Sequence, residues 1–558
     1  MTQRIPMSFD VDARRAQMFP ALTVEQLARV RAFGVEKTFE DGEILFEQGD
    51  RDAPLYVVLE GLLEIVHPRG KLEDPITVHG EREFTGELSM ISDQPALVRG
   101  RAKGRLRVVV VDHERFRALL QTDSDVSELV MRAFILRRVG LLSGGQGDVV
   151  IVGSQHSAAT LRIQEFLVRN AHPYTYVDVD RDKDVQSLLD GVKVDASEIP
   201  ILICSDRRVL RNPTDAEVAD CLGFNRSFEP GVVHDVVICG AGPGGLAAAV
   251  YGASEGLDVL VIEASAPGGQ AATSSKIENY LGFPTGISGQ ALAARALSQT
   301  EKFGARLAVA RGAVRLHCDE PIIRIDIAGG GSVCAKAVVV ATGAEYRKLE
   351  VPELARFEGV GVYYAATFME AQRCSSDEVV VVGGGNSAGQ AATFLARTSR
   401  HVHMVIRGPD LVASMSRYLI RRIEETPNIT LHRRTRIVGL AGKDHLEQVT
   451  WVDDTKGEET TRDIRHLFTM AGAAPNTAWL RGCVAVDAKG FVQTGADLTP
   501  DLLKANGWPL ARPPYLFETS RPHVFAVGDV RASSVKRVAS AVGEGSVCIQ
   551  LVHRVLAE

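Results

Sequence analysis

Long hydrophobic runs and a leader-like start are both missing from this sequence. No apolar stretch approaches the roughly 20 residues that a membrane-spanning helix needs. The first residues, MTQRIPMSFDVDARRAQMF, are polar and mixed in charge, without the apolar core of a signal peptide. The hydrophobic content of 45% and the charged content of 24% are those of an ordinary globular protein. We therefore predict a cytoplasmic protein that does not cross a membrane.

Excess positive charge is also absent. The net charge is −7, so nothing in the overall balance favours the phosphate-neutralising surface that nucleic acids require. We predict no nucleic-acid partner. The chain has 558 residues, which is too long for one core and predicts several domains, at roughly 100–200 residues per domain.

Cysteine is present but not in the patterns that bind metals or form local redox pairs. No two cysteines have Cys-x-x-Cys spacing, and none clusters with histidine. We predict no metal, and we predict that each cysteine is a buried, reduced thiol. The eight cysteines are Cys204, Cys221, Cys239, Cys318, Cys334, Cys374, Cys483 and Cys548.

What the sequence does contain begins with short β-branched runs between about Leu22 and Leu142. Thr23 followed by Gln26 indicates a capping box at a helix start. The runs that follow are punctuated by glycines that fit tight turns of a small β-roll, and a helical stretch closes the unit. We assign an N-terminal extension to residues 1–21 and a β-roll to residues 22–145.

This unit resembles the cyclic-nucleotide-binding domain. In that family a Gly-Glu pair contacts the ribose, and an arginine just after a proline pairs with the phosphate. Gly86 and Glu87 match the pair, whereas Ala96 follows Pro95 where the arginine belongs. We therefore favour a docking or dimerisation module over a cyclic-nucleotide sensor, and nucleotide binding is doubtful. Arg99 or Arg101 could replace the arginine only if the loop takes another shape.

Residues 146–228 alternate between strand-like and helix-like runs, which predicts a small α/β domain. The predicted strands are DVVIVG, YTYVDVD and IPILICS, and the predicted helices are AATLRIQEFLVRN, VQSLLDGV and DAEVADCLG. The order of the runs resembles glutaredoxin or thioredoxin. The family's two redox cysteines would fall on Ser157 and Thr160, and its cis proline on Pro200. Because thiol–disulfide exchange needs a thiolate, we predict a binding or scaffolding domain without redox activity.

The run VHDVVICGAGPGGLAAAVYGASEGLDVLVIE predicts a dinucleotide site. Gly240, Gly242 and Gly245 have the GxGxxG spacing between a strand and a small-residue helix. The first glycine suits the turn, the second lets the backbone approach a pyrophosphate, and the third allows close packing of the helix. Glu263 ends the next strand, where a carboxylate can accept from ribose hydroxyls.

Residues 233–558 resemble the low-molecular-weight thioredoxin reductases, in the runs GGQAATSSKIENYLGFP, VVVATGA, AGAAPNTAWL and VFAVGDV. The resemblance implies FAD as the cofactor and a homodimer as the assembly. It places some residues near the isoalloxazine ring, others in the loop that returns from the nicotinamide domain, and a late Gly-Asp pair at the ribityl chain. These residues are, in turn, Gly269, Gln270 and Asn279; Thr342 and Gly343; and Gly528 and Asp529.

A second Rossmann half begins at EVVVVGGGNSAGQAATFLA. Its glycine loop has GxGxxA spacing, with Gly383, Gly385 and Ala388 as the motif positions and Asn386 and Ser387 between them. The strand that follows runs into Arg407 rather than an acid, which favours the 2′-phosphate of NADPH over NADH. On the later helix, Arg417, Arg421 and Arg422 either contribute to this site or form a solvated helix face.

The redox cysteines of thioredoxin reductases are replaced here. The family's Cys-Ala-Thr-Cys aligns with Ala365, Ala366, Thr367 and Phe368, and its following aspartate aligns with Met369. Our first hypothesis is therefore an NADPH-dependent flavin oxidoreductase that passes electrons directly to an external acceptor, such as a ferredoxin- or flavodoxin-like protein, a quinone or a dye. The second is a thioredoxin reductase that uses Cys374 or Cys548, and the third is a redox-responsive scaffold.

The expected architecture is multidomain. A β-roll and a thioredoxin-like α/β domain precede an FAD domain, formed by residues 229–348 and 476–558, and a nicotinamide domain, residues 349–475. Both of these are expected to have Rossmann-like α/β folds.

Overall fold

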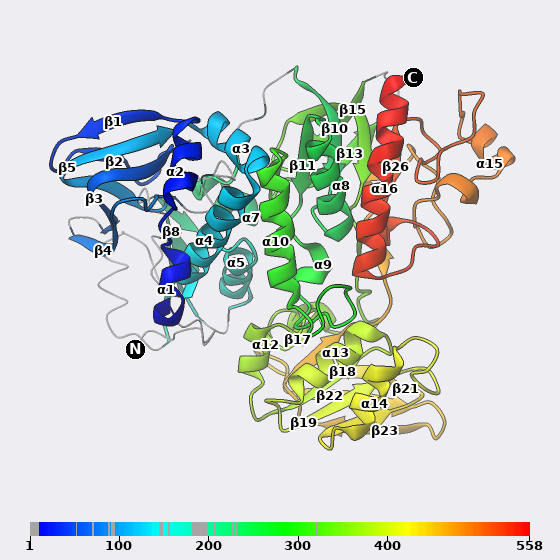
Figure 1. The fold of residues 1–558 in the computed structure, drawn as a ribbon. Helices are drawn as coiled ribbons and strands as arrows, with labels where there is room; N and C mark the ends of the chain where they lie inside the picture. Colours follow the sequence, from blue (N-terminus) through cyan, green and yellow to red (C-terminus); the bar gives the residue numbers. More distant parts are fainter. Residues whose placement is uncertain are drawn as a thin grey trace.

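The structure, a computed structural model, describes most of the chain: residues 11–51, 53–69, 72–86, 90, 95–143, 149–154, 157–180, 198–204, 208–225, 228, 231–318 and 322–558. Its elements form an N-terminal unit, a middle unit and two larger domains that carry the rest of the chain (Figure 1).

The N-terminal unit is an antiparallel β-roll flanked by helices. Thr23 caps the second helix, because its side chain accepts from the Gln26 N–H while the Gln26 side chain accepts from the Thr23 N–H, which confirms the predicted capping box. The β-strands pair in the order β1-β5-β3-β4, and β2 pairs with β5. The elements are α1 (Val11–Met18), α2 (Val24–Arg31), β1 (Val35–Phe39), β2 (Ile44–Phe46), β3 (Leu55–Arg69), β4 (Leu72–His79), β5 (Arg99–Val111), α3 (His113–Thr122) and α4 (Ser124–Ser143).

The middle unit has a four-stranded sheet in the order β7-β6-β8-β9. Strand β7 runs parallel to β6, whereas β8 and β9 are antiparallel. The predicted strands and two of the three predicted helices are confirmed, and β9 was not predicted. The third helix, VQSLLDGV, lies outside the described residues. The elements are β6 (Val149–Gly153), α5 (Ala158–Arg169), β7 (Tyr174–Asp178), β8 (Ile201–Ile203), β9 (Val209–Arg211) and α7 (Asp215–Cys221).

A seven-stranded sheet organises what we call the first Rossmann domain. Its parallel strands are β12, β11, β10, β15 and β26, and β14 and β13 extend it as an antiparallel meander. Helices α8 and α16 pack on the sheet through a core that includes Leu246 and Ile549. The elements are β10 (Val233–Cys239), α8 (Pro243–Ser254), β11 (Val259–Glu263), α9 (Gly269–Ala272), α10 (Gly289–Lys302), β12 (Arg306–Val309), β13 (Ala313–His317), β14 (Ile323–Ile327), β15 (Ser332–Val340), β26 (Val524–Ala526), η5 (Gly528–Val530) and α16 (Val538–Ala557).

The second Rossmann domain has a parallel sheet in the order β17-β24-β18-β19-β20 and a three-stranded antiparallel sheet, β21-β22-β23. The chain enters it after β16 and leaves it at β25, and these two short strands pair with each other. The elements are β16 (Ala344–Glu345), α11 (Leu354–Phe357), β17 (Val362–Tyr363), α12 (Phe368–Arg373), β18 (Glu378–Val382), α13 (Asn386–Leu395), β19 (His401–Val405), α14 (Arg417–Glu425), β20 (Ile429–His432), β21 (Thr435–Ala441), β22 (Gln448–Asp453), β23 (Glu458–Arg462), β24 (His466–Thr469) and β25 (Ala474–Pro475).

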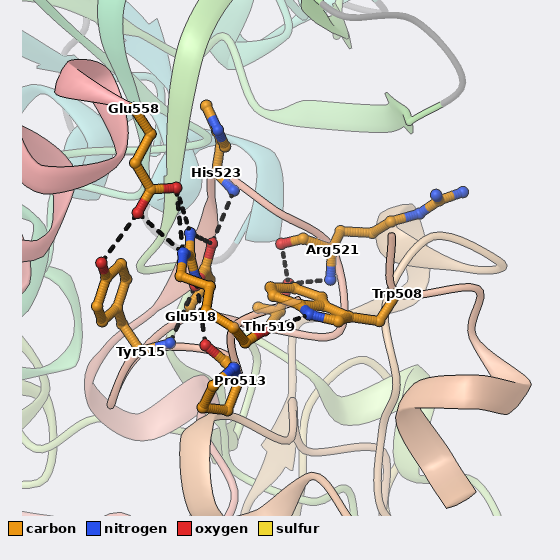
Figure 2. A network of polar contacts seen from close by, with 9 residues as sticks. Trp508, Pro513, Tyr515, Glu518, Thr519, Arg521, His523 and Glu558 are labelled. Carbon is orange, nitrogen blue, oxygen red and sulfur yellow. Dashed lines mark hydrogen bonds and ion pairs between the residues drawn. The ribbon is translucent and has the colours of Figure 1, made fainter. Parts of the chain in front are cut away.

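A polar network links Glu558, the residue after α16, to a long connecting segment of the first Rossmann domain, which we call the excursion (Figure 2). The excursion follows η3 (Ala478–Leu480) and η4 (Gly495–Asp497) and contains α15 (Pro500–Ala505). Glu518 is fully buried and accepts from the Tyr515 N–H at 2.9 Å and from Arg512 at 2.6 Å. Arg512 and the Tyr515 hydroxyl also donate to Glu558, each at 2.9 Å. The network therefore fixes the end of α16 beside the excursion.

Candidate functional site

The first glycine-rich turn lies between β10 and α8 and leaves room for a ligand. Gly240 has φ +108°, and a Cβ there would lie 2.3 Å from the Ala341 oxygen. A Cβ on Gly245 would lie 1.9 Å from the Gly240 oxygen, so both positions require glycine. Gly242 differs, because a Cβ there would meet nothing within 4 Å, and no side chain caps the helix that it starts. The uncapped start of α8 therefore adjoins open space at Gly242, which suits an anion.

Glu263, at the end of β11, stabilises this turn by accepting hydrogen bonds from its backbone. Its carboxylate accepts from the Ala241 N–H at 2.7 Å and from the Ser265 N–H at 2.9 Å. Burial raises the pKa of Glu263, and the two backbone donors oppose that shift. Two carboxylate oxygens offer about four acceptor sites, so Glu263 can hold the turn and still accept from a ribose hydroxyl.

A second glycine-rich segment packs against the first. A Cβ on Gly269 would lie 3.0 Å from the Gly242 Cα, and the Gly268 N–H donates to the Ala241 oxygen at 2.7 Å. The structure thus brings together two segments that are separated in the sequence. Gln270 on α9 and Asn279 in the following loop are exposed, and their proximity to a cofactor stays a prediction.

The returning loop and the Gly-Asp segment complete this edge of the sheet. The Thr342 hydroxyl donates to the Asn476 oxygen at 2.8 Å, and the Asn476 N–H donates to the Gly343 oxygen at 3.1 Å. Gly528 has φ +72°, and its N–H donates to Glu544 at 2.7 Å. Thr342 and Gly343 follow β15, and Gly528 follows β26, at the carboxyl ends of two parallel strands, where open α/β sheets bind ligands.

Asp529 is a partly buried carboxylate that accepts no hydrogen bond from a described residue. Burial raises its pKa, and the Lys536 ammonium opposes that shift. A carboxylate in such a position gains stability from hydroxyl donors that a ligand supplies. The ribityl hydroxyls of FAD are donors of this kind.

The second Rossmann turn repeats the design of the first. A Cβ on Gly383, where φ is +141°, would lie 2.7 Å from the Met470 oxygen. Gly385 begins α13 without a side-chain cap, and a Cβ there would meet nothing within 4 Å. Ala388 is fully buried in the same helix. The Asn386 side chain accepts from the Ser416 N–H at 2.8 Å and so fixes the loop before α14.

Arg407 follows β19 and is exposed, without an ion pair to any described residue. The three arginines of α14 differ among themselves. Arg421 pairs with Glu425 at 2.7 Å, and Arg422 pairs at 2.7 Å with Glu278 of the first Rossmann domain. Arg417 is exposed. Arg407 is therefore the available cation closest to the end of the strand, which is the position where a 2′-phosphate is bound in such folds.

Tyr346 is a residue that sequence reasoning missed. It lies directly after β16, where the chain crosses between the two Rossmann domains, and packs against the core of the second. Burial raises its pKa, a hydrogen bond with Ser387 lowers it, and the charge of Asp529 raises it. The Tyr346 phenol therefore interacts with one residue of each site: Asp529 in the first Rossmann domain and Ser387 in the second. Nothing in the sequence around Tyr346 signals this, because the contact depends on how the domains meet.

A helix begins at the segment that the sequence resemblance aligns with the redox pair of thioredoxin reductases. The Thr367 N–H donates to Glu370 at 2.8 Å and its hydroxyl donates to the same carboxylate, which starts α12. Ala366 is buried. The nearest cysteine along the chain is Cys374, which is fully buried, and burial raises the pKa of its thiol to about 11.

The prediction that all eight cysteines are reduced is wrong for four of them. The structure pairs Cys204 with Cys221 and Cys318 with Cys483. The partners are separated by 17 and 165 residues, so a search for local spacing could not find them. The other four are free, and of these only Cys334 is partly exposed. Cys374 and Cys548 lie in different hydrophobic cores.

In the N-terminal unit, the two arginines considered as phosphate ligands are already paired. Arg99 donates to Glu47 at 2.8 Å and also pairs with Glu73. Arg101 pairs with Glu64 and with Glu73, each at 2.7 Å. Gly86 has φ +105° and Ala96 is buried, whereas Glu87 lies outside the described residues. No group of three or more His, Cys, Asp or Glu in the described part of the chain could hold a metal ion.

Two uncapped helix starts, each with open space before it, fit two dinucleotide pyrophosphates. Glu263 and Asp529 add acceptors at the first site, and Arg407 adds a cation at the second. These observations fit FAD in the first Rossmann domain and NADPH in the second. A pair of such sites, linked by Tyr346, is typical of a flavin- and nicotinamide-dependent oxidoreductase.

Comparison with known proteins identifies the family. The chain belongs to the pyridine nucleotide-disulphide oxidoreductase family, whose profile matches residues 234–545. Residues 36–123 match the cyclic nucleotide-binding domain. The chain is 34% identical over 327 residues to a thioredoxin reductase of Mycolicibacterium smegmatis, and the match covers 58% of this chain and 97% of that protein.

A thioredoxin reductase of Bacillus subtilis is 31% identical over 328 residues, which cover 58% of this chain and 96% of the relative. Among solved structures, the thioredoxin reductase of Lactococcus lactis superposes with a TM-score of 0.52 at 26% identity, covering 58% of this chain and 99% of that one. Thioredoxin reductases use FAD and NADPH, and the oxidoreductase domain of this chain fits both cofactors. The chain is an NADPH-dependent flavin oxidoreductase. Among the described helices, none is long and apolar enough to cross a membrane.

Proposed function

We propose that the protein oxidises NADPH and passes the electrons directly to an acceptor outside the chain, without an internal cysteine pair. The observation that carries this proposal is the content of residues 365–368, Ala-Ala-Thr-Phe, at the position that resembles the redox centre of thioredoxin reductases. FAD supplies hydride acceptance from NADPH and electron donation onward when it is bound.

The residues of the chain bind and orient the two cofactors in this proposal. The N–H groups at the starts of α8 and α13 hold the pyrophosphates, and Arg407 holds the 2′-phosphate. Gln270, Asn279, Thr342 and Gly343 are assigned to the flavin surroundings, and Asp529 accepts from the ribityl hydroxyls. Tyr346 lies where the two sites meet and orients Ser387. The proposed cofactor domains are residues 229–348 with 476–558, and residues 349–475.

The alternative that Cys374 or Cys548 replaces the lost pair has weaker physical support. A redox thiol must be reachable and must ionise, because the thiolate is the reacting species. Both thiols are 0% exposed, and burial raises the pKa of each. A ferredoxin- or flavodoxin-like protein or a quinone therefore suits this site better as acceptor than a thioredoxin-like disulfide protein does.

The middle unit supports the same proposal. Its strand order and its helices α5 and α7 fit a thioredoxin-like domain. Ser157 caps α5 by accepting from the Thr160 N–H, and a Cβ on Gly153 would touch both Thr160 and Pro200. The predicted cis bond at Ile199–Pro200 is present. Hydroxyl groups at Ser157 and Thr160 cannot exchange disulfides, so the positions aligned with that family's redox pair do not supply the missing pair. The unit's own disulfide, Cys204–Cys221, is buried, with its cysteines 2% and 7% exposed.

The test is an acceptor series under anaerobic steady-state conditions with NADPH. We expect turnover with ferricyanide, a quinone and ferredoxin, and none with thioredoxin disulfide. The double variant Cys374→Ser with Cys548→Ser is expected to retain the wild-type rates. Reduction of thioredoxin disulfide by the wild type, lost in the double variant, would show that these cysteines carry the electrons.

A further inference from the structure

The middle unit, residues 149–225 as far as they are described, touches both Rossmann domains (Figure 1). Helices α5 and α7 of the middle unit lie between the N-terminal unit and α10 of the first Rossmann domain. Helix α12 of the second Rossmann domain lies below them in the view of Figure 1. These two contacts differ in character, and together they indicate what the unit does.

The contact with the first Rossmann domain is a shared hydrophobic core. Val309 and Ala310, at the end of β12, are 4% and 5% exposed and belong to the same cluster as Ile163, Phe166 and other side chains of the middle unit. A common core holds two units in one orientation, because separating them would expose apolar surface on both sides.

Polar side chains also form hydrogen bonds across this contact, and they fix the position of the middle unit relative to the first Rossmann domain. The Asn225 side chain donates to the Val309 oxygen at 2.9 Å and accepts from the Val309 N–H at 2.8 Å, so it satisfies both backbone groups of one residue. Arg311 donates to both oxygens of Asp220 at 2.8 Å. The Gln290 side chain of α10 also donates to the Val168 oxygen at 3.3 Å. These bonds specify one geometry, whereas a mobile carrier domain needs a contact that releases easily.

The middle unit approaches the second Rossmann domain at the residues that precede and form α12. A Cβ on Gly359 would lie only 3.3 Å from the Ala158 Cβ, so the start of α5 approaches the backbone of this segment closely. The charges of Glu370 and Arg373 act on Glu165 of α5, and Arg373 also acts on Tyr174 of β7. Segment 359–373 contains Ala365 and Phe368, the positions aligned with the family's redox pair.

We infer that the middle unit is a fixed cover, built into the chain, that occupies the surface of segment 359–373 and keeps external partners away from it. An electron acceptor must then dock elsewhere, and the middle unit does not swing between donor and acceptor as a carrier domain would. The cover has the strand order and the helices that the proposed function describes as thioredoxin-like. The description of the cover as thioredoxin-like rests on the proposed function, but the contacts do not.

The test compares backbone amide exchange in the full FAD-bound chain, without NADPH or acceptor, so that its result is independent of the electron route. The anchor variant combines Asp220→Asn with Asn225→Ala. The control is Asp215→Asn, which removes a charge from the same helix α7, but one that pairs with Arg162 inside the middle unit. We expect exchange in 359–373 to rise about tenfold or more in the anchor variant and to stay at the wild-type rate in the control.

Two results would overturn the inference. One is faster exchange throughout the middle unit of the anchor variant while 359–373 exchanges at the wild-type rate, since the unit then covers nothing there. The other is an anchor variant that matches the wild type everywhere. If the anchor variant loses FAD or unfolds, the same exchange measurement on the single variant Glu165→Lys tests the inference instead. The new lysine places a cation near Glu370. We expect slower exchange in 359–373 from this variant, and faster or unchanged exchange there would contradict the cover.

Discussion

At the scale of single residues, the two glycine loops show why some positions can be recognised in a sequence and others cannot. Gly240 and Gly383 satisfy local needs, a positive φ and a close backbone approach, and these needs repeat wherever such a turn occurs. The motif therefore predicts them. Tyr346 satisfies a need that exists only after the two Rossmann domains have come together beside Ser387 and Asp529, so no local pattern marks it.

Arg407 carries the cofactor preference in this account. Replacing it by alanine removes the exposed cation at the end of β19. We expect the KM for NADPH to rise about tenfold, or about 1.4 kcal/mol, while the KM for NADH changes by less than about twofold. Steady-state kinetics with both nucleotides measures the difference.

Arg400→Ala is the matched control for Arg407. Arg400 is also exposed and lies just before β19, at the end of the strand opposite to Arg407, where it pairs with Glu378. We expect both KM values to stay near those of the wild type. An equal rise of the KM for NADPH and for NADH in Arg407→Ala would contradict the assigned role, because NADH has no 2′-phosphate.

At the scale of elements, the uncapped start of α8 is the place where we propose that the chain binds the flavin cofactor. Gly242 has an ordinary φ of −70°, and a Cβ there meets no protein atom within 4 Å. Alanine at this position therefore leaves the fold intact and projects a methyl group into the space assigned to the pyrophosphate. We expect Gly242→Ala to bind FAD at least about tenfold more weakly, with the free energy of unfolding of the flavin-free chain changed by less than about 1 kcal/mol.

Flavin absorbance after gel filtration and thermal unfolding of the flavin-free chain measure the two effects. Gly80→Ala is the control, because Gly80 also lacks a neighbour within 4 Å but lies in the N-terminal unit. Full flavin occupancy in Gly242→Ala would place the pyrophosphate elsewhere. Loss of the fold would instead mean that the helix start, and not the ligand, needs the glycine.

Elements also differ in how far the sequence predicts them. The strands and helices around both glycine loops follow from their hydrophobic runs and their glycines. The excursion that carries α15 does not, because Arg512 joins Glu518 to Glu558, which lies 46 residues further along the chain than Arg512. The pairing of Cys318 with Cys483 could not be predicted for the same reason, because the two cysteines are 165 residues apart and spacing patterns describe only nearby cysteines.

At the scale of the whole molecule, the sequence predicts an order of domains but not their mutual arrangement. The crossings at β16 and β25 lie close to the expected boundaries of the nicotinamide domain. The fixed mounting of the middle unit on β12 could not be predicted, since Asn225 and Val309 are unremarkable in their own segments. Arrangement matters for function here, because it determines which surfaces an acceptor can reach.

The central claim is that electrons leave the flavin without passing through a cysteine pair of the chain. Anaerobic titration of the FAD-bound protein with NADPH, followed by flavin absorbance and by thiol counting in denaturant, tests it most directly. We expect full flavin reduction with about one equivalent of NADPH per FAD and no increase in thiols. Consumption of a second equivalent, accompanied by two new thiols per chain, would contradict the account, because a disulfide would then be taking electrons from the flavin.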